Sequence, residues 1–203
     1  MMKLIRKIKK HEMLRRWAIA EVYVMYNDVI NEAAPQHLLR LLHSNEVDLE
    51  HVGIRESLKP HHLSLINCLP EKIFWYVALL EMTRNEFDKL NTLRVPEFEK
   101  ITEYSCKVAD AAIKLCENPN LNIRINNIKQ NLISESKAMQ WSGLTLISRG
   151  IDGPFVVVEG NGRLISLYQL MFLEKESDFS NYQLEVVLGI SEEDFELGYQ
   201  YVD

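Results

Sequence analysis

Residues 154–163 read PFVVVEGNGR, and this stretch sets the expected architecture of the second half of the chain. Residues 154–159 are apolar and β-branched at successive positions, which is typical of a strand that is buried on both faces. Gly160 and Gly162 allow the backbone to turn tightly. Apolar residues then recur at helical spacing over about 162–173. The stretch therefore predicts a buried strand, a glycine turn and a helix.

The same turn predicts an anion-binding site. A helix start presents unpaired backbone N–H groups and a partial positive charge, and an arginine adds a fork of donors that suits phosphate. We therefore expect Gly160, Asn161, Gly162 and Arg163 to bind phosphate. Glu159 is the candidate catalytic residue, because at the strand end it could act as a base, hold a metal ion or orient Arg163. The alternative is a plain strand-to-helix turn in which a surface Arg163 pairs with Glu159.

The rest of the second half is expected to alternate between strands and helices. Short apolar runs predict strands, and the amphipathic stretches between them predict helices. The expected strands are 121–125, 144–148, 154–159 and 182–190, and the expected helices are 126–139, about 162–173 and one that starts at 191–194.

This order of elements, with a G-x-x-R loop from Gly160 to Arg163, resembles the ParB/sulfiredoxin-like superfamily over about residues 121–203. The resemblance implies that the loop contacts the phosphates of a nucleoside di- or triphosphate, bound with Mg²⁺. Members of the superfamily hydrolyse CTP, phosphorylate serine with ADP or repair sulfinic acid with ATP. Sulfiredoxins carry a cysteine where this chain has Gly162, so sulfinic acid repair is not expected. The chromosome-partitioning branch adds a DNA-binding domain, for which the residues up to Asp203 leave no room.

The first 119 residues are expected to be mostly helical. A helical or mixed segment is expected over 4–30, and helices are expected over 38–42, over about 70–93 and over about 96–117. Asn118, Pro119 and Asn120 form the best boundary, because proline and asparagine favour turns. The chain is therefore expected to be an α+β protein with a helical region over 1–119 and a small mixed-sheet, ParB/sulfiredoxin-like region over 120–203. These two regions can pack as one domain.

Positive charge is concentrated at the N-terminus. The chain of 203 residues has a formal net charge of −6, but residues 1–16 contain seven Lys or Arg and one Glu. A basic arm of this kind could contact nucleic acid. The candidate contacts are Lys7, Lys9, Lys10, Arg15 and Arg16. The alternative is an amphipathic helix that turns its apolar side to the core. The acidic remainder argues against a broad duplex-binding face.

Several classes of protein are not expected. The three cysteines do not form a disulfide framework or a metal pattern, and Cys106 and Cys116 are expected as core thiols on one helix. The histidines lack metal-ligand spacing, so no metal site is predicted. No apolar run is long enough for a membrane span, and no secretory signal is evident. We therefore expect a reduced, cytoplasmic protein.

These observations favour a nucleotide- or phosphate-binding ParB-like protein, with a small kinase or nucleotidase as the candidate activity. The second hypothesis is a non-catalytic module that binds a protein partner through its helices, in a phage, plasmid or defence system. The third hypothesis is a nucleic-acid binder that acts through residues 3–16.

Overall fold

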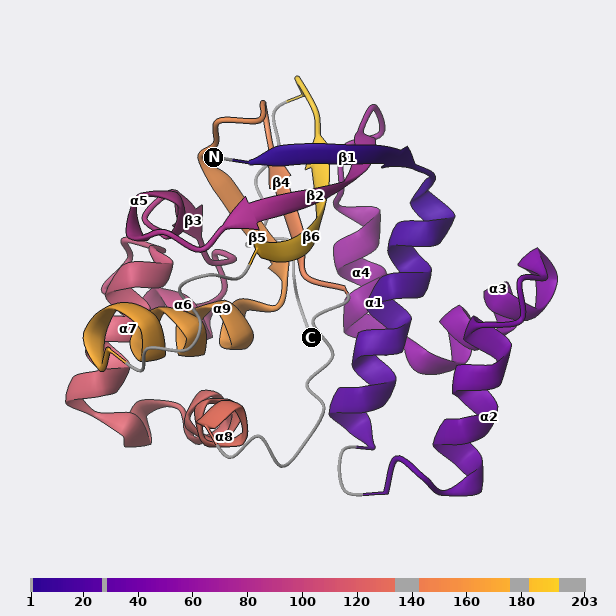
Figure 1. Ribbon diagram of the computed structural model, residues 1–203, viewed down its shortest axis with the longest axis horizontal. Coiled ribbons are helices and arrows are strands. Elements are labelled where there is room, and N and C mark those ends of the chain that lie inside the picture. The colour runs from indigo at the N-terminus through magenta and orange to yellow at the C-terminus, as the bar shows by residue number, and fades with distance from the viewer. Residues whose placement is uncertain (1, 27–28, 134–142, 176–182, 194–203) are drawn as a thin grey trace.

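A six-stranded mixed sheet lies at the centre of the protein. The computed structural model describes residues 2–26, 29–133, 143–175 and 183–193 (Figure 1). The strands lie in the order β1-β2-β6-β4-β5-β3. Their bounds are β1 (Lys3–Ile8), β2 (Phe74–Glu81), β3 (Leu90–Asn91), β4 (Thr145–Ser148), β5 (Phe155–Glu159) and β6 (Gln183–Ile190). The expected α+β class is confirmed.

The helices form two groups on either side of the sheet in the view of Figure 1. The first group is α1 (Lys10–Met25), α2 (Ala33–Leu42), α3 (Val47–Ser57) and α4 (Pro60–Asn67). The second is α5 (Arg84–Phe87), α6 (Pro96–Ile101), α7 (Val108–Glu117), the short η1 (Pro119–Leu121), α8 (Ile123–Ile133) and α9 (Asn161–Tyr168), which continues as the π-helical η2 (Gln169–Leu173). Within the described ranges, no helix combines the length and apolar character that crossing a membrane requires.

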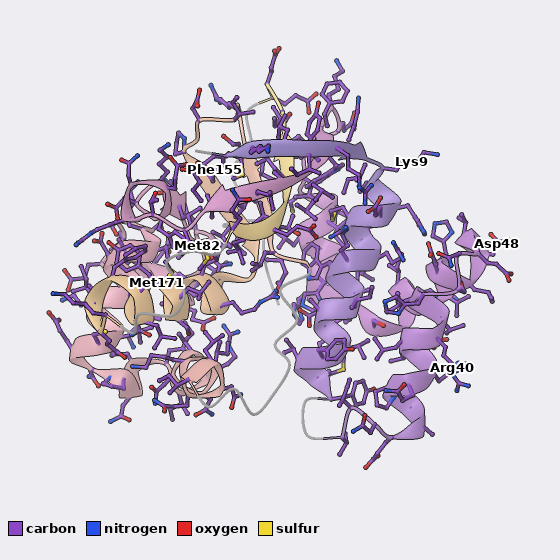
Figure 2. The ribbon with its side chains drawn as sticks, viewed as in Figure 1. Lys9, Arg40, Asp48, Met82, Phe155 and Met171 are labelled. Carbon is purple, nitrogen blue, oxygen red and sulfur yellow. The ribbon has the colours of Figure 1, made fainter. Side chains whose placement is uncertain are left out.

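Strands from both halves of the sequence share the sheet: β6, β4 and β5 from the second half lie together between β2 and β3 from the first half. β2 pairs antiparallel with β6 along its whole length, from Phe74 opposite Ile190 to Glu81 opposite Gln183. One continuous hydrophobic core contains residues from both regions, from Met2 to Leu188. Figure 2 shows Lys9, Arg40 and Asp48 at the periphery, whereas Phe155 and Met82 lie inside, where both are buried.

The structure corrects the expectation of a long helix over about 70–93. Residues Phe74–Glu81 form β2 instead, followed by the single turn α5 and the short β3. The segment FWYVALLE is apolar almost throughout, so its apolar residues fit a helical stripe as well as a strand. It lies between β1 and β6, where Trp75, Val77 and Leu80 are buried.

The N-terminal expectation is also corrected in part. Residues Lys3–Ile8 form the edge strand β1, which pairs antiparallel with β2, and helix begins only at Lys10. The basic arm is therefore a strand followed by the first turns of α1.

Two further expected elements are wrong. The helix expected over about 96–117 is broken between α6 and α7, where the Thr102 hydroxyl donates to the Phe98 carbonyl and accepts from the Cys106 N–H. Cys106 therefore lies before α7, whereas Cys116 lies within it. The strand expected over 121–125 is helical instead, since Asn122 Oδ1 accepts from the Ile125 N–H and caps the start of α8.

The expectations around the glycine turn are confirmed. Strands occur where expected as β4, β5 and β6, and a helix follows the turn as α9 and η2. Val157 and Val158 are buried, and Val156 is half-buried, so both faces of β5 are covered. The end of the helix expected over 126–139 and the helix expected from 191–194 extend outside the described residues.

Candidate functional site

The turn between β5 and α9 depends on glycine. Gly160 is the N-cap of α9 and has φ +98°, a conformation that other residues rarely adopt. A Cβ at Gly160 would lie 2.1 Å from Leu144 Cδ2, and one at Gly162 would lie 2.9 Å from Ile128 Cδ1. The space that the two glycines leave is thus filled by protein side chains from the start of β4 and from α8. Both glycines let neighbouring elements approach the turn closely.

The first turn of α9 carries unpaired polar groups. Among the residues that the structure describes, no side chain caps this helix at its start. The Asn161 side chain donates to the Val157 carbonyl at 3.0 Å, while its buried Oδ1 has no partner among the described residues. A ligand could therefore find both helix-start N–H groups and an amide acceptor at this position.

Arg163 is buried, whereas the sequence predicted an exposed arginine. Only 6% of the residue is exposed, and its Nη2 lies 3.2 Å from Glu159 Oε1. Burial raises the pKa of Glu159, and the Arg163 guanidinium offsets part of that rise. The pair that the plain structural alternative predicts is therefore present, but its arginine is buried and its glutamate is half-buried.

Glu21 is a component of this site that the sequence analysis missed. It lies on α1, and only 7% of it is exposed. Burial and the nearby Glu159 carboxylate raise the pKa of Glu21 to about 7, although Arg163 acts in the opposite direction. The sequence did hold a signal, because Glu21 is the one charged residue in the otherwise apolar stretch from Trp17 to Met25.

His62 on α4 lies next to Glu21 and is the fourth residue of this site. Its Nδ1 accepts the Lys59 backbone N–H at 3.2 Å, so the proton of the neutral ring is on Nε2, which lies 3.6 Å from Glu21 Oε2. Burial lowers the pKa of His62 to about 4, so the ring is neutral at pH 7. Trp17 Nε1, buried beside His62, lies near the Glu21 carboxylate, and its N–H opposes part of the rise in the pKa of Glu21. We call Glu21, His62, Glu159 and Arg163 the turn cluster.

The turn cluster is suited to acid–base chemistry next to a bound anion. It contains a guanidinium for charge, a helix start for hydrogen bonds and two carboxylates whose pKa values are raised. Carboxylates whose pKa values are shifted in this way are found more often at functional sites than elsewhere. In the described part of the chain, no group of three His, Cys, Asp or Glu side chains is placed to hold a metal ion.

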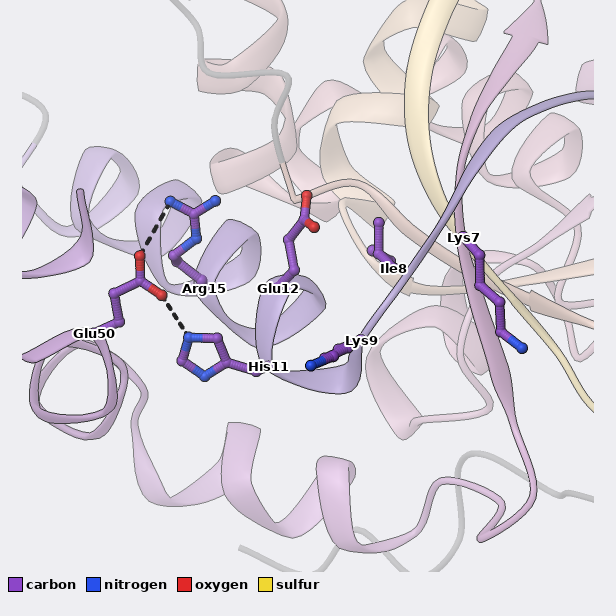
Figure 3. Close-up of a pocket in the computed structure, with 7 residues that line it drawn as sticks. All are labelled: Lys7, Ile8, Lys9, His11, Glu12, Arg15 and Glu50. Atoms are coloured by element: carbon purple, nitrogen blue, oxygen red, sulfur yellow. Dashed lines mark hydrogen bonds and ion pairs between the residues drawn. The ribbon is translucent and has the colours of Figure 1, made fainter. Parts of the chain in front are cut away.

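The basic residues expected to contact nucleic acid lie at the corner where β1 meets α1. A pocket of about 630 Å³ opens there and is lined by Lys7, Ile8, Lys9, His11, Glu12, Arg15 and Glu50 (Figure 3). Lys9 and Lys10 are exposed, and the Lys7 ammonium lies 4.2 Å from the centre of the Phe74 ring. The pocket is therefore rimmed by lysines but is not uniformly basic.

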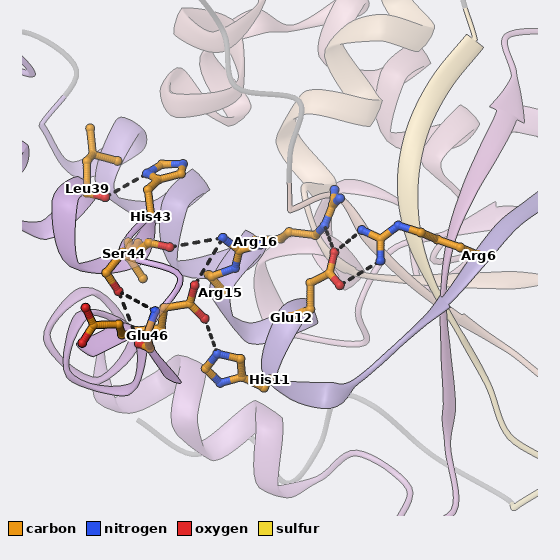
Figure 4. A network of polar contacts seen from close by, with 11 residues as sticks. Arg6, His11, Glu12, Arg15, Arg16, Leu39, His43, Ser44 and Glu46 are labelled. Atoms are coloured by element: carbon orange, nitrogen blue, oxygen red, sulfur yellow. Dashed lines mark hydrogen bonds and ion pairs between the residues drawn. The ribbon is translucent and has the colours of Figure 1, made fainter. Parts of the chain in front are cut away.

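The two arginines of that set are engaged within the protein. Figure 4 shows a chain of polar contacts along this corner. Glu12 accepts from Arg6 at 2.9 Å and from Arg16 at 3.2 Å, and Arg16 also reaches Glu185. Glu50 contacts His11 and lies 3.5 Å from Arg15. These six residues, Arg6, His11, Glu12, Arg15, Arg16 and Glu50, are the corner network. Its arginines already neutralise carboxylates, which leaves the three lysines as the basic residues of this corner with no carboxylate contact in the described structure.

Comparisons of the chain with models of protein families, with curated proteins and with solved structures gave no match. The resemblance to the ParB/sulfiredoxin-like superfamily therefore stays a prediction.

Proposed function

We propose that the protein binds a phosphorylated small molecule, with a nucleoside di- or triphosphate as the expected class, at the turn between β5 and α9. The observation that carries this proposal is the burial of Arg163 and Glu21, with the half-buried Glu159 beside Arg163, at a helix start that no side chain of the described residues caps. A solvent-exposed structural ion pair would need neither the burial nor the second carboxylate. Buried charge is costly, so an excess of it favours a functional role.

Phosphate fits the donors of the turn. The Arg163 guanidinium can form two parallel hydrogen bonds to phosphate oxygens, and the start of α9 adds backbone donors and a partial positive charge. The Trp17 Nε1–H, which lies near the Glu21 carboxylate and beside His62, would add a further donor. To bind phosphate, Arg163 would turn part of its fork away from Glu159.

The carboxylates would supply the chemistry of a small kinase or nucleotidase. Both reactions need a base that takes a proton from a hydroxyl or a water as the phosphoryl group is transferred. Glu159 is the candidate base that the sequence predicts, and the buried Glu21, whose pKa is raised to about 7, is a second candidate. Mg²⁺ would arrive with the nucleotide, held mainly by phosphates and water, as is usual for this ion. The three free thiols suit a reducing, cytoplasmic setting.

Calorimetric titration tests this proposal. ATP, ADP and CTP are titrated with MgCl₂ into the wild-type protein, into Arg163→Lys and into the control Arg40→Lys, which makes the same change at an exposed arginine on α2. Arg163→Lys keeps the charge and loses the fork, so we expect affinity to fall about tenfold, while Arg40→Lys leaves it unchanged. If the wild type binds none of the three nucleotides, the proposal fails and the interaction-module hypothesis takes its place.

A further inference from the structure

The two edges of the sheet differ in how far they are covered. At one edge, β3 is two residues long and Leu90 is fully buried, and the Thr92 N–H that follows donates to the Cys106 carbonyl at 2.8 Å. At the other edge, β1 is six residues long, residues 3–7 are exposed, and β2 is its one partner among the described strands. Outside that ladder, no backbone hydrogen bond of the described residues involves Lys3–Ile8. The outward N–H and C=O groups of β1 can therefore pair with another strand.

The open edge of β1 is basic. It carries Lys3, Arg6 and Lys7 and no acidic residue. Arg6 is paired with Glu12, whereas the two lysines have no carboxylate contact among the residues that the structure describes. Two copies of β1 placed edge to edge would bring like charges opposite each other, which destabilises a strand pair. An acidic strand would bring opposite charges together, so the charge of β1 favours an acidic partner over a second copy of the chain.

The register of β1 places a free cation on each face of the sheet. Because Ile5 is an extra residue in the ladder, the β2 partners of Lys3 and Lys7 are three residues apart, so the two lysines lie on opposite faces. The Lys7 ammonium lies 4.2 Å from the centre of the Phe74 ring. Leu4 and Ile5 are 38% and 49% exposed. A strand added to this edge would therefore cover apolar surface and meet a lysine on either face.

We propose that β1 is a docking edge for an acidic peptide in extended conformation, which adds to the sheet as a further strand. Backbone hydrogen bonds to β1 supply affinity, and acidic side chains that face Lys3 and Lys7 supply the preference for this partner. The pocket at the corner continues from the end of β1, because Lys7, Ile8 and Lys9 line it (Figure 3). Lys9 can meet a further carboxylate of the peptide there. This surface is separate from the turn cluster and does not depend on the proposed function.

The same features favour a peptide over a nucleic acid. The arginines of this corner, Arg6, Arg15 and Arg16, are engaged with carboxylates, which leaves few cations to neutralise a phosphate backbone. A nucleic acid also has no backbone that can continue the hydrogen-bond ladder of a strand, whereas an extended peptide does.

A ¹H–¹⁵N NMR titration tests this inference. The probe is a peptide of eight alternating Glu and Val residues, acetylated and amidated, which is added to the labelled full chain at pH 7.5 and low salt. We expect saturable shifts of the backbone amides of β1. Lys3→Gln and Lys7→Gln should each weaken binding about two- to fivefold, because each removes one cross-strand charge pair. Lys100→Gln, the same change at an exposed lysine on α6, should leave binding unchanged.

Two further probes separate strand addition from simple charge attraction. The same peptide with N-methyl groups on two adjacent central residues keeps its charge but loses an N–H on each edge of the strand, so it should bind about fivefold more weakly or less. An oligonucleotide of eight thymidines supplies negative charge without a peptide backbone and should not shift the β1 amides in the same way. Equal binding of the methylated peptide, unchanged affinity in both lysine variants, binding of the oligonucleotide alone, or no shift with the Glu-Val peptide would overturn the inference.

Discussion

Glu12 and Glu21 lie on the same helix, α1, but in opposite electrostatic surroundings. The Arg6 guanidinium lowers the pKa of Glu12, and Arg16 contributes in the same direction. Burial raises the pKa of Glu21 to about 7, and the nearby Glu159 raises it further than Arg163 lowers it. One carboxylate is therefore paired with two arginines near the surface, while the other is buried near a second carboxylate, Glu159.

The difference separates a structural contact from a candidate functional site. The corner network joins β1 to α1 and has a cation for each carboxylate, as expected for contacts that position an edge strand. The turn cluster costs free energy in its ionised state, and a protein tolerates such a cost mainly where the groups have a further role. The following predictions test this contrast.

The largest effect is expected from removing Arg163. Arg163→Ala removes the buried guanidinium that acts on the half-buried Glu159 and the buried Glu21, so we expect the free energy of unfolding at pH 8 to fall by about 3–5 kcal/mol. The loss should be smaller at pH 5, because protonated carboxylates need no cation. Urea unfolding at both pH values measures this. Equal losses at the two pH values would show that Arg163 acts through packing and not through charge.

A somewhat smaller effect is expected from pH itself. The pKa of Glu21 is raised from 4.5 to about 7 on folding, so the folded state holds its proton more tightly. The stabilisation is complete below pH 4.5 and is lost as pH rises through 7, which amounts to about 3 kcal/mol. Glu21→Gln cannot ionise and should be more stable than the wild type at pH 8, but not at pH 4.5. Identical pH profiles for the two proteins would contradict the raised pKa.

The smallest effect is expected in the corner network. The Arg6 side chain is 50% exposed where it meets Glu12, and exposed ion pairs contribute little. Arg6→Ala should therefore lower the free energy of unfolding by less than about 1 kcal/mol, and the loss should shrink at high salt. A loss as large as that of Arg163→Ala would remove the distinction between the two regions.

Local sequence signals predicted the elements around the turn but not the sheet that contains them. PFVVVEGNGR specifies its strand and helix through β-branched residues and through a glycine that needs φ +98°. β2 was predicted as a helix because its pairing partner, β6, lies about 110 residues further along the chain. An apolar run that is buried on both faces has no periodicity to distinguish a strand from a helix. Asn122, whose side chain caps the start of α8, is a local signal in the sequence that favours a helix over a strand at 121–125.

The candidate site was predictable only in part for a similar reason. Residues 159–163 are contiguous, so one motif predicts them together. Glu21 and His62 reach the turn from α1 and α4, and their positions depend on how these helices pack against the sheet. The burial of Arg163 also depends on tertiary packing, because the side chains of Leu144 and Ile128 pack against Gly160 and Gly162.

The most direct test of the central claim is a ¹H–¹⁵N NMR titration of the labelled protein with ATP and MgCl₂ at pH 7. We predict saturable shifts of the backbone amides of Gly160, Asn161 and Gly162 and of the Trp17 indole N–H, with the amides of Lys9 and Lys10 unmoved. Saturable shifts confined to Lys9, Lys10 and their neighbours, or no shifts at all, would contradict the claim that the turn cluster is the functional site.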